Sequence, residues 1–108
     1  VTLFQHAIAV THQNYIAHNN LGFAYVRQGN YKEAFFHYKE ALKISPNYSD
    51  AHNNLGALMA WNGNIGDAIK EFRLALKAEP DHALAKKNLR IALEIQRKGR
   101  HSRTDFER

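Results

Sequence analysis

The sequence predicts an all-α fold in which antiparallel helix pairs stack into a superhelical solenoid. The hexapeptide AHNNLG occurs at residues 17–22 and again at 51–56, and the correspondence extends without a gap over 15–48 and 49–82, an offset of 34 residues. Apolar residues recur with helical spacing in both units, and a proline closes each one. A fixed period in this range indicates a repeat array in which each unit packs on the next.

Residues 1–14 are predicted to be the second helix of a truncated preceding unit. Their apolar residues lie 34 positions before those of the second helix in the next unit. Without a first helix to cover them, these side chains are expected to be exposed, and exposed apolar patches tend to find partners. Self-assembly as a homodimer through this helix is therefore one hypothesis. The predicted self-association residues are Leu3, Phe4, Ala7 and Ile8.

Units 15–48 and 49–82 are each predicted to contain a helix, a tight turn and a second helix. In the first helix, apolar residues at i, i+4, i+7 and i+8 form one packing face. A Gly-Asn pair near the middle of each unit suits the left-handed residue that ends a helix. Pro46 and Pro80 cannot continue the second helix, so each marks the passage to the next unit.

Small residues in these units predict that the two helices approach each other closely. Gly22 and Gly56 lie inside the first helices, where glycine costs about 1 kcal/mol relative to alanine. We interpret them as positions where the partner helix leaves no room for a side chain. Ala34 and Ala68, in the second helices, have the same interpretation.

Residues 83–98 are predicted to be a C-terminal capping helix, and residues 99–108 a disordered basic tail. The first-helix pattern continues here, but Arg90 stands at the position of the glycine and no proline-terminated partner helix follows. The net charge of +5 lies entirely in this C-terminal part, because basic and acidic groups balance before it. Nucleic acid and anionic membranes are alternative partners for this basic end. Asp105 and Glu107 interrupt the basic run and so disfavour both partners.

The composition excludes several classes of chemistry. With no cysteine there can be no disulfide, thiol nucleophile or cysteine-ligated zinc, while the compartment stays open with the cytoplasm slightly favoured. No apolar run approaches the roughly 20 residues that span a bilayer. No nucleophile motif or phosphate-binding glycine loop occurs, so neither an enzyme nor a cofactor is predicted. His18 and His52 occupy equivalent places in successive units, too far apart to share a metal ion, and are expected to be packing residues.

Each complete unit carries leucine, glycine, alanine, aromatic and proline residues at matching positions. The set is Leu21, Gly22, Tyr25, Ala34, Tyr38, Ala41 and Pro46 in the first unit, and Leu55, Gly56, Met59, Ala68, Phe72, Ala75 and Pro80 in the second. This pattern resembles the tetratricopeptide repeat. The resemblance implies a right-handed superhelix whose first helices line a concave groove that holds extended peptides, and hence a protein–protein interaction module. Met59 stands where the family has an aromatic residue, a departure that does not threaten the fold.

The first helices carry a second face, away from these packing contacts, on which function is expected. Asn20, Asn54 and Asn88 recur there at intervals of 34 residues. Such a row resembles the asparagine ladder in the repeat region of O-linked N-acetylglucosamine transferases, which grips substrate backbone. An amide suits this role because it offers both a donor and an acceptor. An alternative is that each asparagine satisfies a neighbouring loop or is a tolerated surface residue.

Aromatic and basic residues flank this row. Phe23 and Trp61 are expected to provide apolar contacts in the groove, although Trp61 could instead pack over the turn at Gly63. Arg27 and Lys87 could meet an acidic ligand. The predicted peptide-binding residues are Asn19, Asn20, Phe23, Arg27, Asn53, Asn54, Trp61, Lys87 and Asn88.

Three functional hypotheses follow from these patterns. The leading one is a module that binds an extended peptide or a partner helix in the groove. The second is self-assembly through residues 1–14. The third is an accessory repeat region of a larger enzyme, such as a glycosyltransferase.

Overall fold

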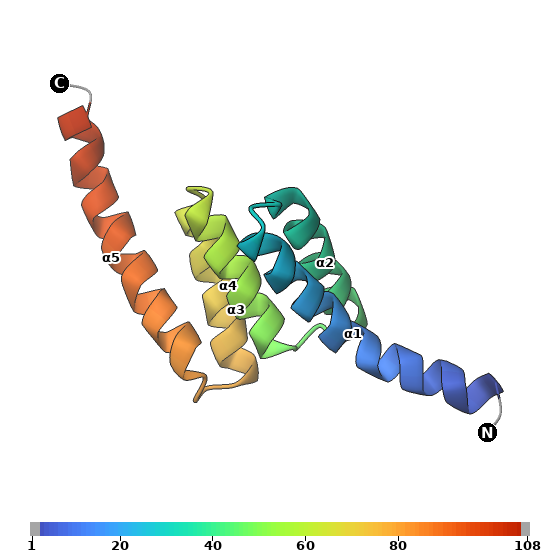
Figure 1. Ribbon diagram of the computed structural model, residues 1–108. Helices are drawn as coiled ribbons and strands as arrows, with labels where there is room; N and C mark the ends of the chain where they lie inside the picture. The colour runs from blue at the N-terminus through green and yellow to red at the C-terminus, as the bar shows by residue number, and fades with distance from the viewer. Residues whose placement is uncertain (1–2, 107–108) are drawn as a thin grey trace.

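The structure, a computed structural model, describes the backbone of residues 3–106 and the side chains of residues 14–99. Within that range it consists of helices joined by short connections, with no strand (Figure 1). The helices are α1 (Leu3–Arg27), α2 (Tyr31–Ile44), α3 (Ser49–Trp61), α4 (Ile65–Ala78) and α5 (Ala83–Phe106). The predicted all-α repeat solenoid is confirmed. No helix in the described range is both long enough and apolar enough to cross a membrane.

Two antiparallel helix pairs, α1–α2 and α3–α4, form the two complete units, and α5 packs beside the second pair (Figure 1). Both pairs turn at a glycine in the left-handed region, Gly29 with a φ of 78° and Gly63 with a φ of 88°. The Asn30 N–H then donates to the Tyr25 carbonyl, and the same bond recurs in the second pair, each 2.8 Å long. These bonds close both first helices with a Schellman motif, so the two turns share one geometry.

Each first helix passes directly over an aromatic ring of its second helix. A Cβ atom on Gly22 would lie 2.5 Å from Cε1 of Tyr38, and a Cβ atom on Gly56 would lie 2.7 Å from Cε1 of Phe72. Both rings are buried, and burial raises the pKa of Tyr38 to about 12. Any side chain at either glycine would require the ring beneath it to move. The interpretation of both glycines as points of close approach is therefore confirmed.

Two apolar cores connect neighbouring elements of the solenoid. The first core consists of Ala34 and Tyr38 from α2 with Leu55 and Leu58 from α3. The second consists of Ala68, Ile69 and Phe72 from α4 with Ala92 from α5. The first core joins one unit to the next, and the second joins the last unit to its capping helix. Burial of this apolar surface holds the stack together.

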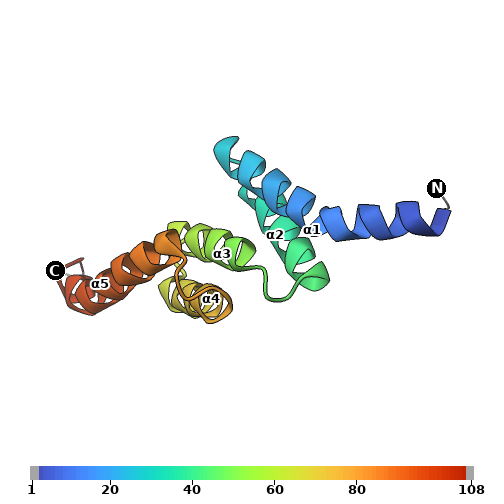
Figure 2. The same ribbon diagram turned by 90° about the horizontal axis from the view of Figure 1, so that it is seen from below.

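α1 is longer than predicted. The sequence predicted that residues 1–14 form a separate second helix, whereas α1 runs through this segment without interruption. α2 and α4 end just before Pro46 and Pro80, and the equivalent position 34 residues before Pro46 is His12. Because histidine, unlike proline, does not stop a helix, α1 continues without a turn. Its N-terminal part therefore leads away from the helix pairs in both views (Figures 1 and 2).

α5 is also longer than predicted. The sequence predicted a disordered tail over 99–108, but the backbone is helical through Phe106. Glu94 forms ion pairs with Arg97 and Lys98 one turn later, which favour the helix, and no proline interrupts the segment. Several side chains named in the sequence predictions lie outside the described residues. They are those of Leu3, Phe4, Ala7 and Ile8 and those of the basic tail beyond residue 99.

Candidate functional site

Two pockets lie along the face formed by the first helices. The first pocket, of 320 Å³, is lined by Phe23, Val26, Tyr31, Tyr38, Asn54, Ala57, Leu58 and Trp61. The second pocket, of 260 Å³, is lined by Ala57, Ala60, Trp61, Phe72, Asn88, Ile91, Ala92 and Ile95. Because Ala57 and Trp61 line both, the pockets are adjacent, and we call the two together the groove.

The second pocket repeats the first one unit later. Seven of its eight lining residues lie 34 positions after a residue that lines the first pocket. Tyr38 and Asn54, for example, are replaced by Phe72 and Asn88. The exception is Trp61, whose counterpart Arg27 does not line the first pocket. The groove is therefore a repeated feature of the fold.

Two aromatic side chains are exposed in the groove. Phe23 is 52% exposed and Trp61 is 72% exposed. The centroid of the Trp61 ring lies 6.4 Å from that of Tyr31, which also lines the first pocket. Both aromatics lie where the sequence placed them, and Trp61 forms the shared wall of the two pockets. Apolar rings in a concave surface lose contact with water only when something fills the space beside them.

The asparagines link neighbouring units. Asn54 Nδ2 donates to Asn19 Oδ1 over 3.0 Å, and Asn88 Nδ2 donates to Asn53 Oδ1 over the same distance. Asn19 and Asn53 are buried, at 6% and 2% exposure. Neither is available to a peptide, which differs from the prediction, because packing between successive first helices covers them. The Asn53–Asn54 doublet thus supplies one acceptor to the helix that follows and one donor to the previous unit.

The second asparagine of each doublet keeps unused hydrogen-bonding capacity. An amide has two N–H donors and an oxygen acceptor, and the contact between units uses one donor. Asn54 and Asn88 line the first and second pockets, respectively. Asn20 is exposed and, among the described residues, its side chain makes no hydrogen bond. In the predicted row of Asn20, Asn54 and Asn88, some amide groups are therefore used in contacts between units, and the others remain available to a ligand.

The two predicted basic residues lie at the edges of this arrangement. Arg27 and Lys87 are both exposed, and neither lines the first or the second pocket. Lys87 occupies the position of Asn19 and Asn53 in the repeat, so the chain of amide contacts ends there for lack of an acceptor.

The floor of the groove was not predicted from the sequence. Tyr38 and Phe72 were assigned to the core alone, although each also borders a pocket. On α5, Ile95 lines the second pocket beside Ile91, and each is 45% exposed. The position of Ile95 four residues after Ile91 was a usable signal, because it places both side chains on the same side of the helix.

His52 holds the second unit together behind the groove. Its Nδ1 lies 2.8 Å from Glu71 Oε1 and its Nε2 lies 2.7 Å from the Pro46 carbonyl oxygen. Both partners are acceptors, so both ring nitrogens donate when the imidazole is protonated. The hydrogen bond to Glu71 raises the pKa of His52, helped by the carbonyl and by the charge of Glu71, against desolvation, which lowers it. The contact ties α3 to α4 and to the α2–α3 connection.

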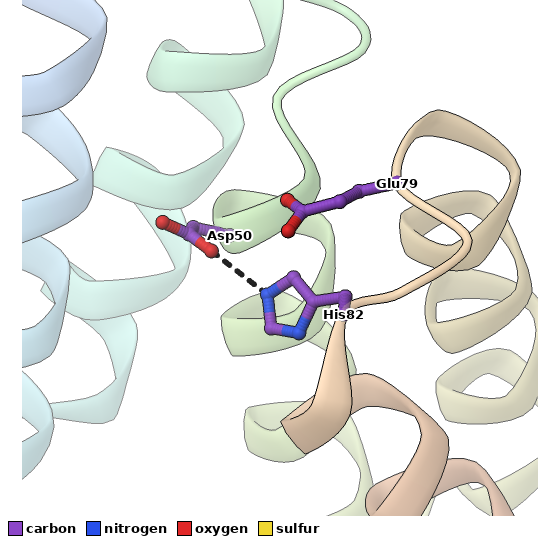
Figure 3. A group of neighbouring side chains, drawn as sticks. All are labelled: Asp50, Glu79 and His82. Carbon is purple, nitrogen blue, oxygen red and sulfur yellow. Dashed lines mark hydrogen bonds and ion pairs between the residues drawn. The ribbon is translucent and has the colours of Figure 1, made fainter.

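Asp50, Glu79 and His82 meet where α3 begins and α4 passes to α5 (Figure 3). Their ligand atoms lie within 4.8 Å of one another, a spacing compatible with a metal ion. The Ala85 N–H donates to His82 Nδ1 over 3.1 Å, so the proton of a neutral ring sits on Nε2, which donates to Asp50 Oδ1 over 2.8 Å. A neutral imidazole cannot offer lone pairs at both nitrogens, so His82 has none for a metal here.

These side chains serve the junction instead. The His82 ring caps the start of α5, because it accepts a backbone N–H that has no partner inside the helix. Ser49 Oγ donates to Glu79 Oε1 over 2.6 Å, which adds a second link between α3 and the α4–α5 connection. We therefore interpret the cluster as a contact that fixes α5 beside α3, and thereby positions the second pocket.

A further hollow of 420 Å³ lies between α4 and α5, outside the groove. Four of its seven lining residues are charged: Lys86, Arg90, Glu94 and Arg97. This composition is typical of the solvated face of a capping helix.

Comparison with known protein families gives two matches. A family model described as tetratricopeptide repeat matches residues 25–90, which is more than half of the 108 residues. A second family model with the same description matches residues 3–36. A search of curated proteins found no match.

Proposed function

The chain belongs to the tetratricopeptide repeat family, whose repeats are in general protein-interaction modules, and we propose that its groove binds an extended peptide with two bulky apolar side chains. Trp61 supports this proposal most directly, because it is largely exposed and lines both pockets. One apolar side chain of the peptide enters each pocket, on either side of the Trp61 ring.

Apolar burial provides most of the affinity. Each pocket, at 320 and 260 Å³, has room for one large side chain such as leucine, methionine or phenylalanine. Burying apolar surface contributes about 25 cal/mol per Å², and enclosed aromatic residues such as Trp61 dominate interface energies. Because only two pockets contribute, we expect a dissociation constant on the order of micromolar for this chain.

The amides of Asn54 and Asn88 favour an extended peptide over a partner helix. A helix satisfies its own backbone groups internally, so it leaves the amides of the groove without partners. An extended peptide presents alternating N–H and C=O groups that match the free donor and acceptor of each amide. Asn20 continues this row at the N-terminal side. The resulting arrangement is similar to the asparagine ladder of O-linked N-acetylglucosamine transferases.

Basic residues at the edges of the groove set a preference for flanking charge. Arg27 and Lys87 are exposed on the same two helices that carry Phe23 and Asn88. Exposed charges of this kind change association rates and salt dependence more than affinity. We therefore expect acidic residues beside the apolar ones to speed binding at low salt.

The proposal is tested with labelled peptides in which two leucines are separated by glycine-serine spacers of varying length. One spacer length should give saturable binding by fluorescence anisotropy. Trp61→Ala should weaken that binding by about tenfold or more, because it removes the wall of both pockets. Leu74→Ala provides the matched control, since Leu74 is exposed on α4 and lines neither pocket.

Two results would contradict the proposal. One is the absence of saturable binding at any spacer length. The other is an equal affinity for the wild-type chain and the Trp61→Ala variant when circular dichroism shows both to be folded.

A further inference from the structure

α1 exposes an apolar face whose equivalent in the next unit is buried. Leu21 on α1 is 45% exposed, whereas Leu55, 34 positions later on α3, is 1% exposed. Ala17 and Ala24 lie on the same side of α1 as Leu21, because they are four and three residues away from it. Both are exposed, and their counterparts on α3 are buried. We call Ala17, Leu21 and Ala24 the open face of α1.

On α3 this face is covered by the second helix of the preceding unit. α2 contributes Ala34 and Tyr38 to the core that contains Leu55. α1 turns different sides to its own neighbours, since Gly22 faces the Tyr38 ring of α2 and Asn19 reaches α3. Successive residues of a helix are rotated by about 100°, so the open face points away from both contacts. In the described range, no helix covers it.

The N-terminal half of α1 continues this face as a heptad pattern. Apolar residues precede the open face at alternating spacings of four and three residues, with one asparagine at the middle. A repeat of this kind along one helix marks a seam for pairing with a second helix. α1 is a single helix over the whole range, so these positions share one side of it. The seam consists of Leu3, Ala7, Val10, Asn14, Ala17, Leu21 and Ala24.

We propose that a second copy of the chain covers this seam, with the two α1 helices paired antiparallel about a twofold axis. An antiparallel pair that places position 3 opposite position 21 also places position 7 opposite position 17 and position 10 opposite position 14. The N-terminal half of each helix then covers the open face of the other. One symmetric contact therefore buries the apolar seam of both chains.

The continuity of α1 argues against cover by residues 3–14 of the same chain. For residues 3–14 to reach the open face of their own helix, α1 would have to turn near residue 12. The other second helices end at Pro46 and Pro80, but the corresponding residue here is His12, which permits the helix to continue. The segment that would cover the face in a folded-back arrangement is therefore presented to a second copy, as in a domain swap.

Sedimentation equilibrium tests the proposal. Over a concentration series the wild-type chain should approach twice the monomer mass of 12.4 kDa. Leu21→Lys places two charges in the seam of the dimer and should return the mass to 12.4 kDa at the same concentrations. Leu74→Lys is the matched control, because Leu74 is 42% exposed on α4 and should leave the dimer intact. A wild-type chain that stays monomeric, or a Leu21→Lys chain that dimerises equally well, would overturn the proposal.

Cysteine cross-linking tests the antiparallel register. The chain has no cysteine, so Ala7→Cys and Ala17→Cys each introduce a single thiol. When mixed and oxidised, the two variants should form a disulfide between chains, because these positions face each other, while neither variant should cross-link to itself. Self-cross-linking of Ala7→Cys would indicate a parallel pair and overturn the register. Leu21 lines neither pocket, so these results are independent of peptide binding in the groove.

Discussion

The two complete units share one backbone plan and differ in what surrounds them. Each has a glycine over a buried ring and a turn at a left-handed glycine. Yet Leu55 is a core residue in the second unit, and Leu21, at the same position of the first unit, lies on the surface. The comparison shows that burial in a solenoid is decided by the neighbouring unit as much as by the unit's own sequence.

The units differ again in the polar contact behind each first helix. In the second unit, protonated His52 donates to two acceptors, Glu71 and the Pro46 carbonyl. In the first unit, His37 replaces the glutamate, and its Nδ1 lies 2.9 Å from Nδ1 of His18. One of these nitrogens must donate and the other accept, so the two rings cannot both be protonated. Acid therefore favours the contact in the second unit, because the hydrogen bond to Glu71 raises the pKa of His52.

Truncating the equivalent leucines should give the largest difference between the units. Leu55→Ala leaves a cavity in the core between α2 and α3 and should lower the free energy of unfolding by about 3 kcal/mol. Leu21→Ala should lower it by less than about 0.5 kcal/mol, because the side chain is already in contact with water. Urea unfolding at a concentration low enough to keep the chain monomeric measures both. Equal costs would show that the open face is covered within the monomer.

Substituting the two close-approach glycines should give a smaller difference. In Gly56→Ala the new Cβ meets the Phe72 ring and the Ala68 carbonyl oxygen at 3.2 Å, so unfolding should be easier by about 2 kcal/mol. In Gly22→Ala the three atoms nearest to the new Cβ all belong to the Tyr38 ring, and α1 can shift toward its open side, so we expect about 1 kcal/mol. Thermal unfolding of the two variants checks the order. A greater cost for Gly22→Ala would refute the mobility assigned to α1.

The contact between His52 and Glu71 should give the second unit a pH dependence of its own. The pKa of His52 is raised in the folded state, so the contact contributes its full stabilisation below the pKa that His52 has in the unfolded chain. This stabilisation is lost as the pH rises through the pKa of His52 in the folded chain. Glu71→Gln should therefore cost about 1.5 kcal/mol near pH 5.5 and less near pH 8.5. Taking the difference in the free energy of unfolding between wild type and variant at each pH isolates the contribution of this contact. A cost that does not vary with pH would contradict the protonated contact.

The asparagine contacts should give the smallest difference. Asn53→Ala removes the acceptor for Asn88 and should cost about 1 kcal/mol, because Asn53 is buried. Asn20→Ala should change stability by less than about 0.5 kcal/mol, since Asn20 is exposed. Chemical unfolding of the two variants tests this. A clear loss in Asn20→Ala alone would place a structural contact at that residue.

Local sequence was sufficient to predict most of the fold. Gly29 and Gly63 marked the turns, and Gly22 and Gly56 marked the close approaches, because each of these features requires glycine for a steric reason. The continuity of α1 was not predicted, although one residue in the sequence explains it. His12 stands where the following units have a proline. The prediction relied on the apolar residues of 1–14, which match those of the next second helix, and gave too little weight to the absence of a proline.

The candidate site was less predictable, because it depends on contacts between units. The 34-residue period correctly aligned Asn54 and Asn88, but periodicity alone does not reveal that each amide reaches a buried asparagine of the previous unit. The pairing of His52 with Glu71 joins two helices and follows no repeat spacing within either. Trp61 was placed in the groove from its position on the first helix, whereas its role as the wall of two pockets required the structure.

Trp61 lies where both pockets meet, so its environment reports the filling of either one. It is the only tryptophan of the chain, and its indole N–H gives a single signal in a nitrogen-15 spectrum. During titration with the two-leucine peptide, we expect this signal and the side-chain amide signals of Asn54 and Asn88 to shift with one common saturation curve. Saturable peptide binding that leaves the Trp61 indole signal unmoved would contradict binding in the groove.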